Sequence, residues 1–291
     1  MKLRTISIVS FLLLAPCVGT AQTVWESSSG ESSVYLKDAG LLSINFSDAN
    51  VKTALVRQIS TSRIRLGAEF KVKSTEGFTS LFEEKEFALP EASGRLFMGR
   101  VSEPPDSQIR FLLYGLQVEY TRGFYKLASV DENGLINLQD KNFDGITGTV
   151  LLNAFVDNFI LPGEFLWGIS LSYGKRNNLN QLKKVDVRKT IASDTNDYAI
   201  QDSRSGRMGQ YEETDDIKLN LDIIWYQKWI KNRFALGLLG RYDGTKDKKP
   251  FVPGMGIYFL KEGAPLNLQG GLTLEWIDDD VRLGLQTGYA F

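Results

Sequence analysis

The segment Asp140-Lys-Asn142-Phe-Asp144-Gly145 carries oxygen-bearing side chains at alternate positions. In a calcium loop such oxygens converge on the ion, and the glycine permits a sharp turn. The position where a bidentate glutamate is expected holds Leu151. Asp140, Asn142 and Asp144 are therefore a weak calcium candidate, and an ordinary Asp-Gly turn in a loop is the favoured interpretation.

Four short acidic runs could bind divalent ions or act as acid/base pairs. They are Glu83 and Glu84, Glu212 and Glu213, Asp215 and Asp216, and Asp278 to Asp280. Most runs of this kind are solvated loops. The last run prompts a hypothesis of contact with lipopolysaccharide through bridging cations.

The residue types on which most enzymes depend are missing from the chain. It contains no histidine, and its single cysteine, Cys17, lies in the N-terminal apolar segment. This excludes a Ser-His-Asp triad, and it leaves no thiolate nucleophile or thiolate metal site after removal of that segment. We therefore expect no enzyme, no cofactor and no strong metal site, and the net charge of −1 indicates no nucleic-acid partner.

The remaining charged residues alternate with apolar ones. Most residues at every second position are apolar in four runs. These are Arg63 to Lys73, 164–173, 217–225 and 266–276. A two-residue period is typical of strands, whereas a helix would scatter both sets around its circumference. Each run has the length that a tilted strand needs to cross a bilayer.

The pattern predicts an all-β chain, a transmembrane antiparallel β-barrel of about twelve strands, with a range of 10 to 14. A soluble β-sandwich is the alternative, because alternation also suits a sheet with one buried face. The expected strands are 42–46, 63–73, 95–101, 110–120, 124–130, 146–156, 164–173, 217–225, 233–242, 252–260, 266–276 and 281–291.

In such a barrel the polar face of each strand points into the lumen, where charge sets the selectivity of an open channel. The predicted basic members exceed the acidic ones, which favours anions modestly, although paired charges could also plug the interior. Phe111, Leu113, Phe155 and Ile224 are expected to point inward too. The predicted lumen-facing charges are Arg63, Arg65, Glu69, Lys71, Lys73, Glu119, Glu164, Lys218, Asp222, Arg233, Arg241, Glu275 and Arg282.

The links between the expected strands divide into short periplasmic turns, such as Thr121–Gly123 and 157–163, and longer outer loops, such as 131–145. Interfacial aromatic residues fit the same topology. Tyr120, Phe165, Trp167, Trp225 and Tyr289 are expected on the periplasmic side, and Tyr173, Tyr242 and Trp276 on the outer side.

The N-terminus has the layout of a secretory signal. Lys2 and Arg4 precede an apolar run, and small residues end at Ala21. We expect a signal peptide over 1–21, an N-terminal periplasmic segment over 22–41 and the barrel over 42–291. A lipid anchor at Cys17 is disfavoured because Pro16 precedes it. The polar segment 175–216 is expected to be a long extracellular loop, either mobile or folded into the lumen.

The chain ends in Arg-Leu-Gly-Leu-Gln-Thr-Gly-Tyr-Ala-Phe. This resembles the C-terminal β-signal of bacterial outer-membrane barrel proteins, an amphipathic last strand with a terminal aromatic residue. The resemblance implies that Tyr289 and Phe291 form an assembly signal for the barrel-assembly machinery. It also implies a bacterial outer-membrane location with both termini periplasmic, and contact with outer-membrane lipid and lipopolysaccharide.

Two functions follow from these expectations. The first is a porin-like channel for small solutes with a weak anion preference, indicated by the polar lumen face. The alternative is a plugged structural or loop-presenting barrel without transport activity, indicated by the inward apolar residues. The sequence leaves the solute, the partner proteins and the oligomeric state open.

Overall fold

The structure is a computed structural model of the chain. It describes residues 39–45, 50–59, 63–73, 91–105, 108–132, 136–158, 161–179, 182–192, 199–227, 234–244, 250–260, 268–277 and 280–289. In these residues no helix has the length and apolar character needed to span a membrane.

The described residues form fourteen strands in one sheet. The strands are β1 (Ala39–Asn45), β2 (Asn50–Gln58), β3 (Ile64–Lys73), β4 (Glu91–Ser102), β5 (Ile109–Val130), β6 (Ile136–Asp157), β7 (Glu164–Asn177), β8 (Lys183–Ala192), β9 (Ala199–Met208), β10 (Glu213–Tyr226), β11 (Phe234–Asp243), β12 (Phe251–Leu260), β13 (Leu268–Ile277) and β14 (Asp280–Tyr289).

Twelve of the described strands pair into a closed antiparallel ring. β1 to β7 pair in chain order, β7 pairs with β10, and β10 to β14 continue in chain order. The seam closes where β1 pairs with β14, with Gly40 opposite Tyr289 and Ile44 opposite Leu285. Closure pairs the backbone N–H and C=O groups of every strand edge in the ring, which lipid hydrocarbon cannot hydrogen-bond. The fold is thus an antiparallel β-barrel, as the alternation predicted.

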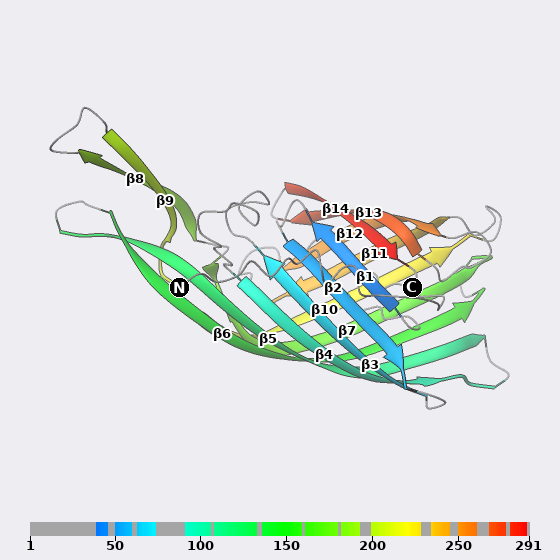
Figure 1. Cartoon of the computed structure of the whole chain (residues 1–291). Helices are drawn as coiled ribbons and strands as arrows, with labels where there is room; N and C mark the ends of the chain where they lie inside the picture. The colour runs from blue at the N-terminus through cyan, green and yellow to red at the C-terminus, as the bar shows by residue number, and fades with distance from the viewer. Residues whose placement is uncertain are drawn as a thin grey trace.

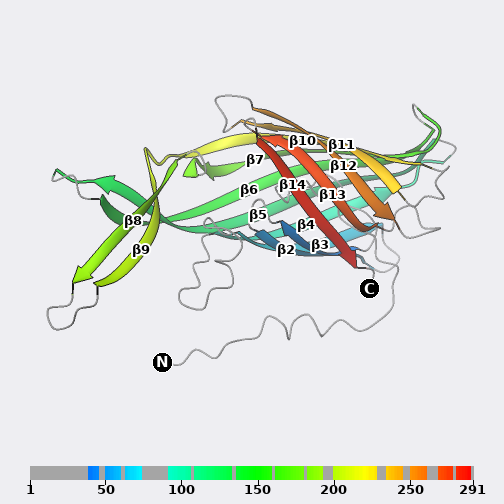
Figure 2. The same ribbon diagram turned by 90° about the horizontal axis from the view of Figure 1, so that it is seen from above.

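The other two strands form a hairpin outside the ring. β8 pairs antiparallel with β9, and β9 makes a short parallel contact with β5 at Leu127 and Ala128. β5 and β6 are 22 residues long and extend well past the end of β4. Figures 1 and 2 show this extension and the β8–β9 hairpin projecting together from one end of the barrel. We call this projecting part, which comprises the described residues of 123–143 and 178–212, the head.

The outer wall of the barrel is apolar. Leu96, Met98, Leu116, Val118 and Leu171 are more than half exposed. The outward positions of β6, Ile146, Val150 and Leu152, and of β10, Ile217, Leu219 and Leu221, are also exposed and uncharged. Five outward positions per strand correspond to roughly 30 Å of strand, or about 25 Å of height after tilting, which matches the apolar band of membrane barrels.

Several predicted elements differ from the structure. The expected turn at Thr121–Gly123 is part of the continuous strand β5, so two predicted strands are one. Strand β2 was not predicted, and the two errors cancel in the count of twelve. Tyr120 consequently lies toward the head, opposite Ile146, and not at the short-turn end where the sequence had placed it.

The expected loops at 131–145 and 175–216 are also largely strand. The first is the start of β6. The described residues of the second include the β8–β9 hairpin, which projects from the end of the barrel and does not fold into the lumen (Figure 2). The predicted barrel start at Leu42 lies inside β1. The signal peptide, the 22–38 part of the N-terminal segment, Arg233 and Phe291 lie outside the described residues.

Candidate functional site: barrel interior and head

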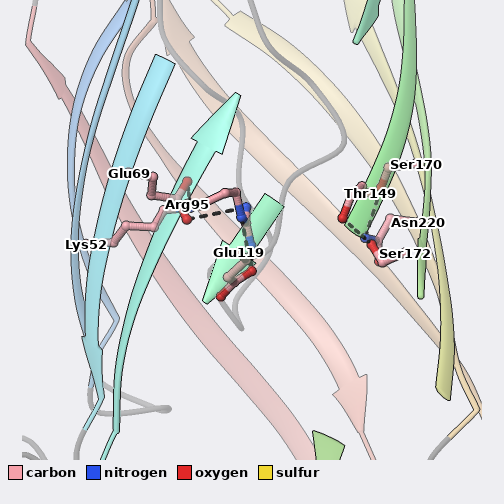
Figure 3. Close-up of polar contacts among 8 residues, drawn as sticks. All are labelled: Lys52, Glu69, Arg95, Glu119, Thr149, Ser170, Ser172 and Asn220. Carbon is pink, nitrogen blue, oxygen red and sulfur yellow. Dashed lines mark hydrogen bonds and ion pairs between the residues drawn. The ribbon is translucent and has the colours of Figure 1, made fainter. Parts of the chain in front are cut away.

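An ion-pair chain crosses four neighbouring strands on the inner face of the barrel. Lys52 Nζ on β2 lies 3.2 Å from Glu69 Oε2 on β3, and Arg95 on β4 reaches the other oxygen of Glu69 at 3.3 Å. The same guanidinium contacts Glu119 on β5 at 2.6 Å (Figure 3). Lys52 is fully buried. Buried charges need partners of opposite sign, and the alternating order supplies them.

Uncharged polar side chains continue this layer on β6, β7 and β10. Thr149 and Ser172 share a hydrogen bond of 2.9 Å between their hydroxyl oxygens, and Asn220 Nδ2 donates to Ser170 Oγ at 3.2 Å (Figure 3). Each pair joins side chains of adjacent strands on the inner face. These polar groups therefore form hydrogen bonds with one another along the inner wall, and not only with water in the lumen.

A second ion pair passes over a glycine. Arg241 Nη2 on β11 donates to Glu275 Oε1 on β13 at 2.8 Å, and both residues are buried. The intervening strand β12 has Gly254 at this level, where a Cβ would lie 2.9 Å from Glu275 Cγ. The missing side chain leaves room for the pair. We call the layer the polar belt: Lys52, Glu69, Arg95, Glu119, Thr149, Ser170, Ser172, Asn220, Arg241 and Glu275.

Below the polar belt, toward the end opposite the head, the interior is apolar. Leu166, Ile224, Tyr226 and Tyr258 have no exposed surface, and Leu113 has 1 %. No water can lie beside side chains that are buried to this degree. We call the cluster the apolar plug: Ala54, Val56, Phe97, Val101, Phe111, Leu113, Leu151, Phe155, Leu166, Ile224, Tyr226, Ala235, Tyr258 and Leu260.

Aromatic rings form the centre of the apolar plug. Phe111 stacks on Phe155 with ring centroids 5.5 Å apart, and Phe155 meets Tyr226 edge to face at 5.8 Å. The ring of Tyr258 lies against the wall at Gly237, Gly256 and Gly271, where a Cβ would come within 2.6 Å of it. Glycines at these three positions let a large ring lie flat on the sheet.

The head has a small core of its own at the mouth of the barrel. Tyr125, Phe143, Leu179 and Leu182 are buried together, and Leu127 and Tyr211 pack against them. Tyr125 donates a hydrogen bond to Glu91 on β4 at 2.9 Å, which ties the β5 extension to the rim. Burial and the nearby Glu91 carboxylate raise the pKa of Tyr125, so its hydroxyl remains a donor.

Charged groups fix the base of the head. Glu213 lies 2.6 Å from Lys175 Nζ and 3.3 Å from Lys141 Nζ, and Lys141 lies over the ring of Tyr211. The hydrogen bond from Lys175 lowers the pKa of Glu213. A carboxylate shared by two lysines on neighbouring strands holds β6, β7 and β10 together beyond the apolar band.

The predicted lumen residues divide into distinct surroundings. Arg65, Glu69, Glu164, Asp222, Arg241 and Glu275 are buried, Glu119 joins Arg95, Lys218 pairs with Asp243 at 3.5 Å, and Glu164 pairs with Arg110 at 3.0 Å. Lys71 and Lys73 are half-buried on β3, whereas Arg63 is exposed before β3 begins. For Arg282 and Tyr289 the structure describes only their backbone pairing, with Glu275 and Gly40.

The calcium-loop hypothesis for Asp140, Asn142 and Asp144 is not supported. All three are exposed on the extended strand β6, where successive members of the set are about 6.6 Å apart and cannot converge on one ion. Asp144 instead contacts the Tyr120 hydroxyl and lies 3.9 Å from Arg122. In the described residues no three acidic, histidine or cysteine side chains gather as metal ligands would.

The sequence interpretation missed Lys52 and Arg95, the two cations of the ion-pair chain. Lys52 lies on the unpredicted strand β2, whose inner face combines Asn50 and Lys52 with Ala54 and Val56. This mixed inner face hides the polar–apolar alternation. Arg95 lies at the start of a predicted strand, and its parity with the buried Phe97 could have identified it as inward.

Comparisons with known proteins add little. The chain matches no protein-family model and no curated protein. A similar solved structure is the β domain of the Bordetella autotransporter BrkA, with 12% sequence identity over 87% of this chain and 95% of that chain. The TM-score is 0.30, so this likeness supports no conclusion about activity.

The class of the protein therefore rests on its own geometry. A closed antiparallel ring, an uncharged apolar outer wall and an inward charged layer are the defining features of a transmembrane β-barrel. A soluble barrel or sandwich would bury this apolar surface instead of exposing it around most of its circumference.

Proposed function

We propose that this chain is a bacterial outer-membrane β-barrel that is closed to passive diffusion and holds its head outside the membrane for a partner. The observation that carries the proposal is the apolar plug. It draws side chains from eight strands, β2, β4 to β7 and β10 to β12, and its central rings have almost no exposed surface. A water-filled channel would expose such lumen-facing residues.

The projecting head supports the second half of the proposal. Its core and its ion pairs give the β5–β6 extension a defined position, which a surface that binds a partner needs. The proposal includes periplasmic termini, contact with outer-membrane lipid and lipopolysaccharide, and insertion by the barrel-assembly machinery through Tyr289 and Phe291. It includes no catalytic role.

A porin-like channel is the second candidate function, and the polar belt is the observation that favours it. The ion pairs nevertheless reduce the support for an anion preference, because Lys52, Arg95 and Arg241 each lie beside a carboxylate. A conducting form would need the apolar plug to rearrange.

Planar-bilayer conductance distinguishes the two functions. Purified, folded wild-type protein is expected to give no discrete current steps. Replacing the central rings with Phe111→Ala, Phe155→Ala and Tyr226→Ala together is expected to produce steps, because the plug then loses three of its five aromatic rings.

The matched control removes outward side chains with Leu116→Ala, Val150→Ala and Leu171→Ala, and it should not conduct. Folding of every variant is checked by the change in gel mobility on boiling. Discrete steps from the wild-type protein would falsify the closed-barrel proposal.

A further inference from the structure

The two ends of the apolar outer wall differ in chemistry. At the end opposite the head, the outward faces of β7 and β10 to β12 end in aromatic rings, with Phe165 stacked on Trp225 and Phe234 packed edge to face on Phe259. Such rings are typical of the membrane interface. Within the described residues, the outward faces of β2 to β4 do not end in aromatic rings at this end of the barrel.

Arginines take the place of aromatic residues there. Arg57 near the end of β2, Arg63 in the β2–β3 link and Arg100 near the end of β4 are all exposed. Val101 N donates to Arg63 O at 2.8 Å, so the backbone of Arg63 is held against β4. We call these three residues the arginine arc.

The three guanidinium groups have no carboxylate partner in the described part of the chain. None of them forms an ion pair there. Arg110 on the adjacent strand β5, in contrast, forms ion pairs with Asp157 and Glu164. Glu103, which follows β4, makes no ion pair in that part either. Among the described residues the arginine arc therefore has no ion-pair partner, unlike the paired cations of the polar belt.

The arc is continuous with the surface that faces lipid tails. Arg57 lies opposite Leu66, and Arg100 lies opposite both Ile64 and Tyr114. Leu66, Ile64 and Tyr114 are 46%, 41% and 43% exposed. From strand spacing and rise, the Cα atoms of Arg57 and Arg100 are roughly 12 Å apart, within reach of one lipid headgroup by two long side chains.

We propose that the arginine arc binds the phosphate of an anionic phospholipid, with the acyl chains against Leu66, Ile64 and Tyr114. Guanidinium groups donate paired hydrogen bonds to phosphate oxygens, and basic residues at a membrane surface attract anionic lipid. The site rests on the proposed membrane insertion but not on closure of the interior. A conducting wild-type barrel would overturn the closure and leave this site standing.

The test is native mass spectrometry of the folded barrel in detergent with added phosphatidylglycerol or phosphatidylcholine. Wild-type protein is expected to retain phosphatidylglycerol preferentially. Arg57→Gln, Arg63→Gln and Arg100→Gln together should reduce that retention by about tenfold or more, given the contribution of each basic residue near a membrane. The matched control, Arg122→Gln, Lys183→Gln and Lys184→Gln, removes the same charge in the head and directly beside it, and should retain the lipid.

Three outcomes overturn the proposal. Equal retention of both lipids by the wild-type protein does so without any variant. Displacement of phosphatidylglycerol by inorganic phosphate at the same concentration indicates a site for free phosphate. Preferential retention of lipopolysaccharide over phosphatidylglycerol, lost in the arginine-arc variant, indicates a different lipid as the ligand.

Discussion

At the scale of single residues, Arg95 is the central member of the ion-pair chain. Its guanidinium contacts Glu69 and Glu119 at the same time, and its side chain is only 13% exposed. Removing one member of a buried charge cluster costs more than the whole cluster contributes, because the remaining charge stays desolvated.

Arg95→Gln is accordingly expected to lower the free energy of unfolding by about 3 kcal/mol, since both carboxylates lose a shared cation. Urea-induced unfolding in lipid vesicles, followed by tryptophan fluorescence, measures this difference. The exposed Arg122→Gln is the control and should change stability by roughly 0.5 kcal/mol or less.

The double variant Arg95→Gln, Glu119→Gln separates the effect of an unpaired carboxylate on stability from the effect of the changed Arg95 side chain. It should recover part of the loss because one unpaired carboxylate is gone. A single variant as stable as the wild type would mean that water, and not Arg95, already solvates Glu69 and Glu119.

At the scale of elements, the head is an extension of barrel strands and a hairpin inserted between β7 and β10. The periodicity could not predict the hairpin, because strands outside lipid need no apolar face. It also could not predict that β5 is continuous, because Arg122 and Gly123 look like a turn. In the structure Gly123 lies under the Tyr125 ring, which explains a glycine inside a strand.

The orientation of the head gives an element-scale prediction. Two single variants test it. Asn137→Cys introduces a cysteine at an exposed position of the head, and Leu161→Cys introduces one at an exposed position of the β6–β7 link at the opposite end. In intact cells a membrane-impermeant maleimide should label the first and not the second. Both should react after the outer membrane is disrupted, and the reverse pattern would mean that the barrel is inverted.

At the scale of the whole molecule, the fold class was predictable and the state of the interior was not. Alternation along each strand identifies two faces, and an uncharged outer face with charges opposite it indicates a membrane barrel. Whether inward side chains meet across the lumen depends on barrel closure and on which strands are neighbours. Phe111 and Phe155 are direct partners on β5 and β6, but Phe155 meets Tyr226 only because β10 follows β7 in the ring.

The seam between β1 and β14 gives the whole-molecule prediction. Ser43 lies opposite Gln286, so Ser43→Cys with Gln286→Cys should form a disulfide across the seam under oxidation. After boiling without reductant, the cross-linked chain should migrate differently from the reduced chain. The offset pair Ser43→Cys with Leu283→Cys is the control, and its cross-linking at the same rate would contradict this register.

The point where the hairpin leaves the ring has a further consequence. Asn178 and Glu212 are joined by two hydrogen bonds, from Asn178 N to Glu212 O at 3.2 Å and from Glu212 N to Asn178 Oδ1 at 2.9 Å. β7 and β10 pair directly behind this stem, so the ring is continuous without the two hairpin strands. Asn178 and Glu212 thus form a closed stem, at which the β8–β9 hairpin joins the membrane wall without taking a place in the ring.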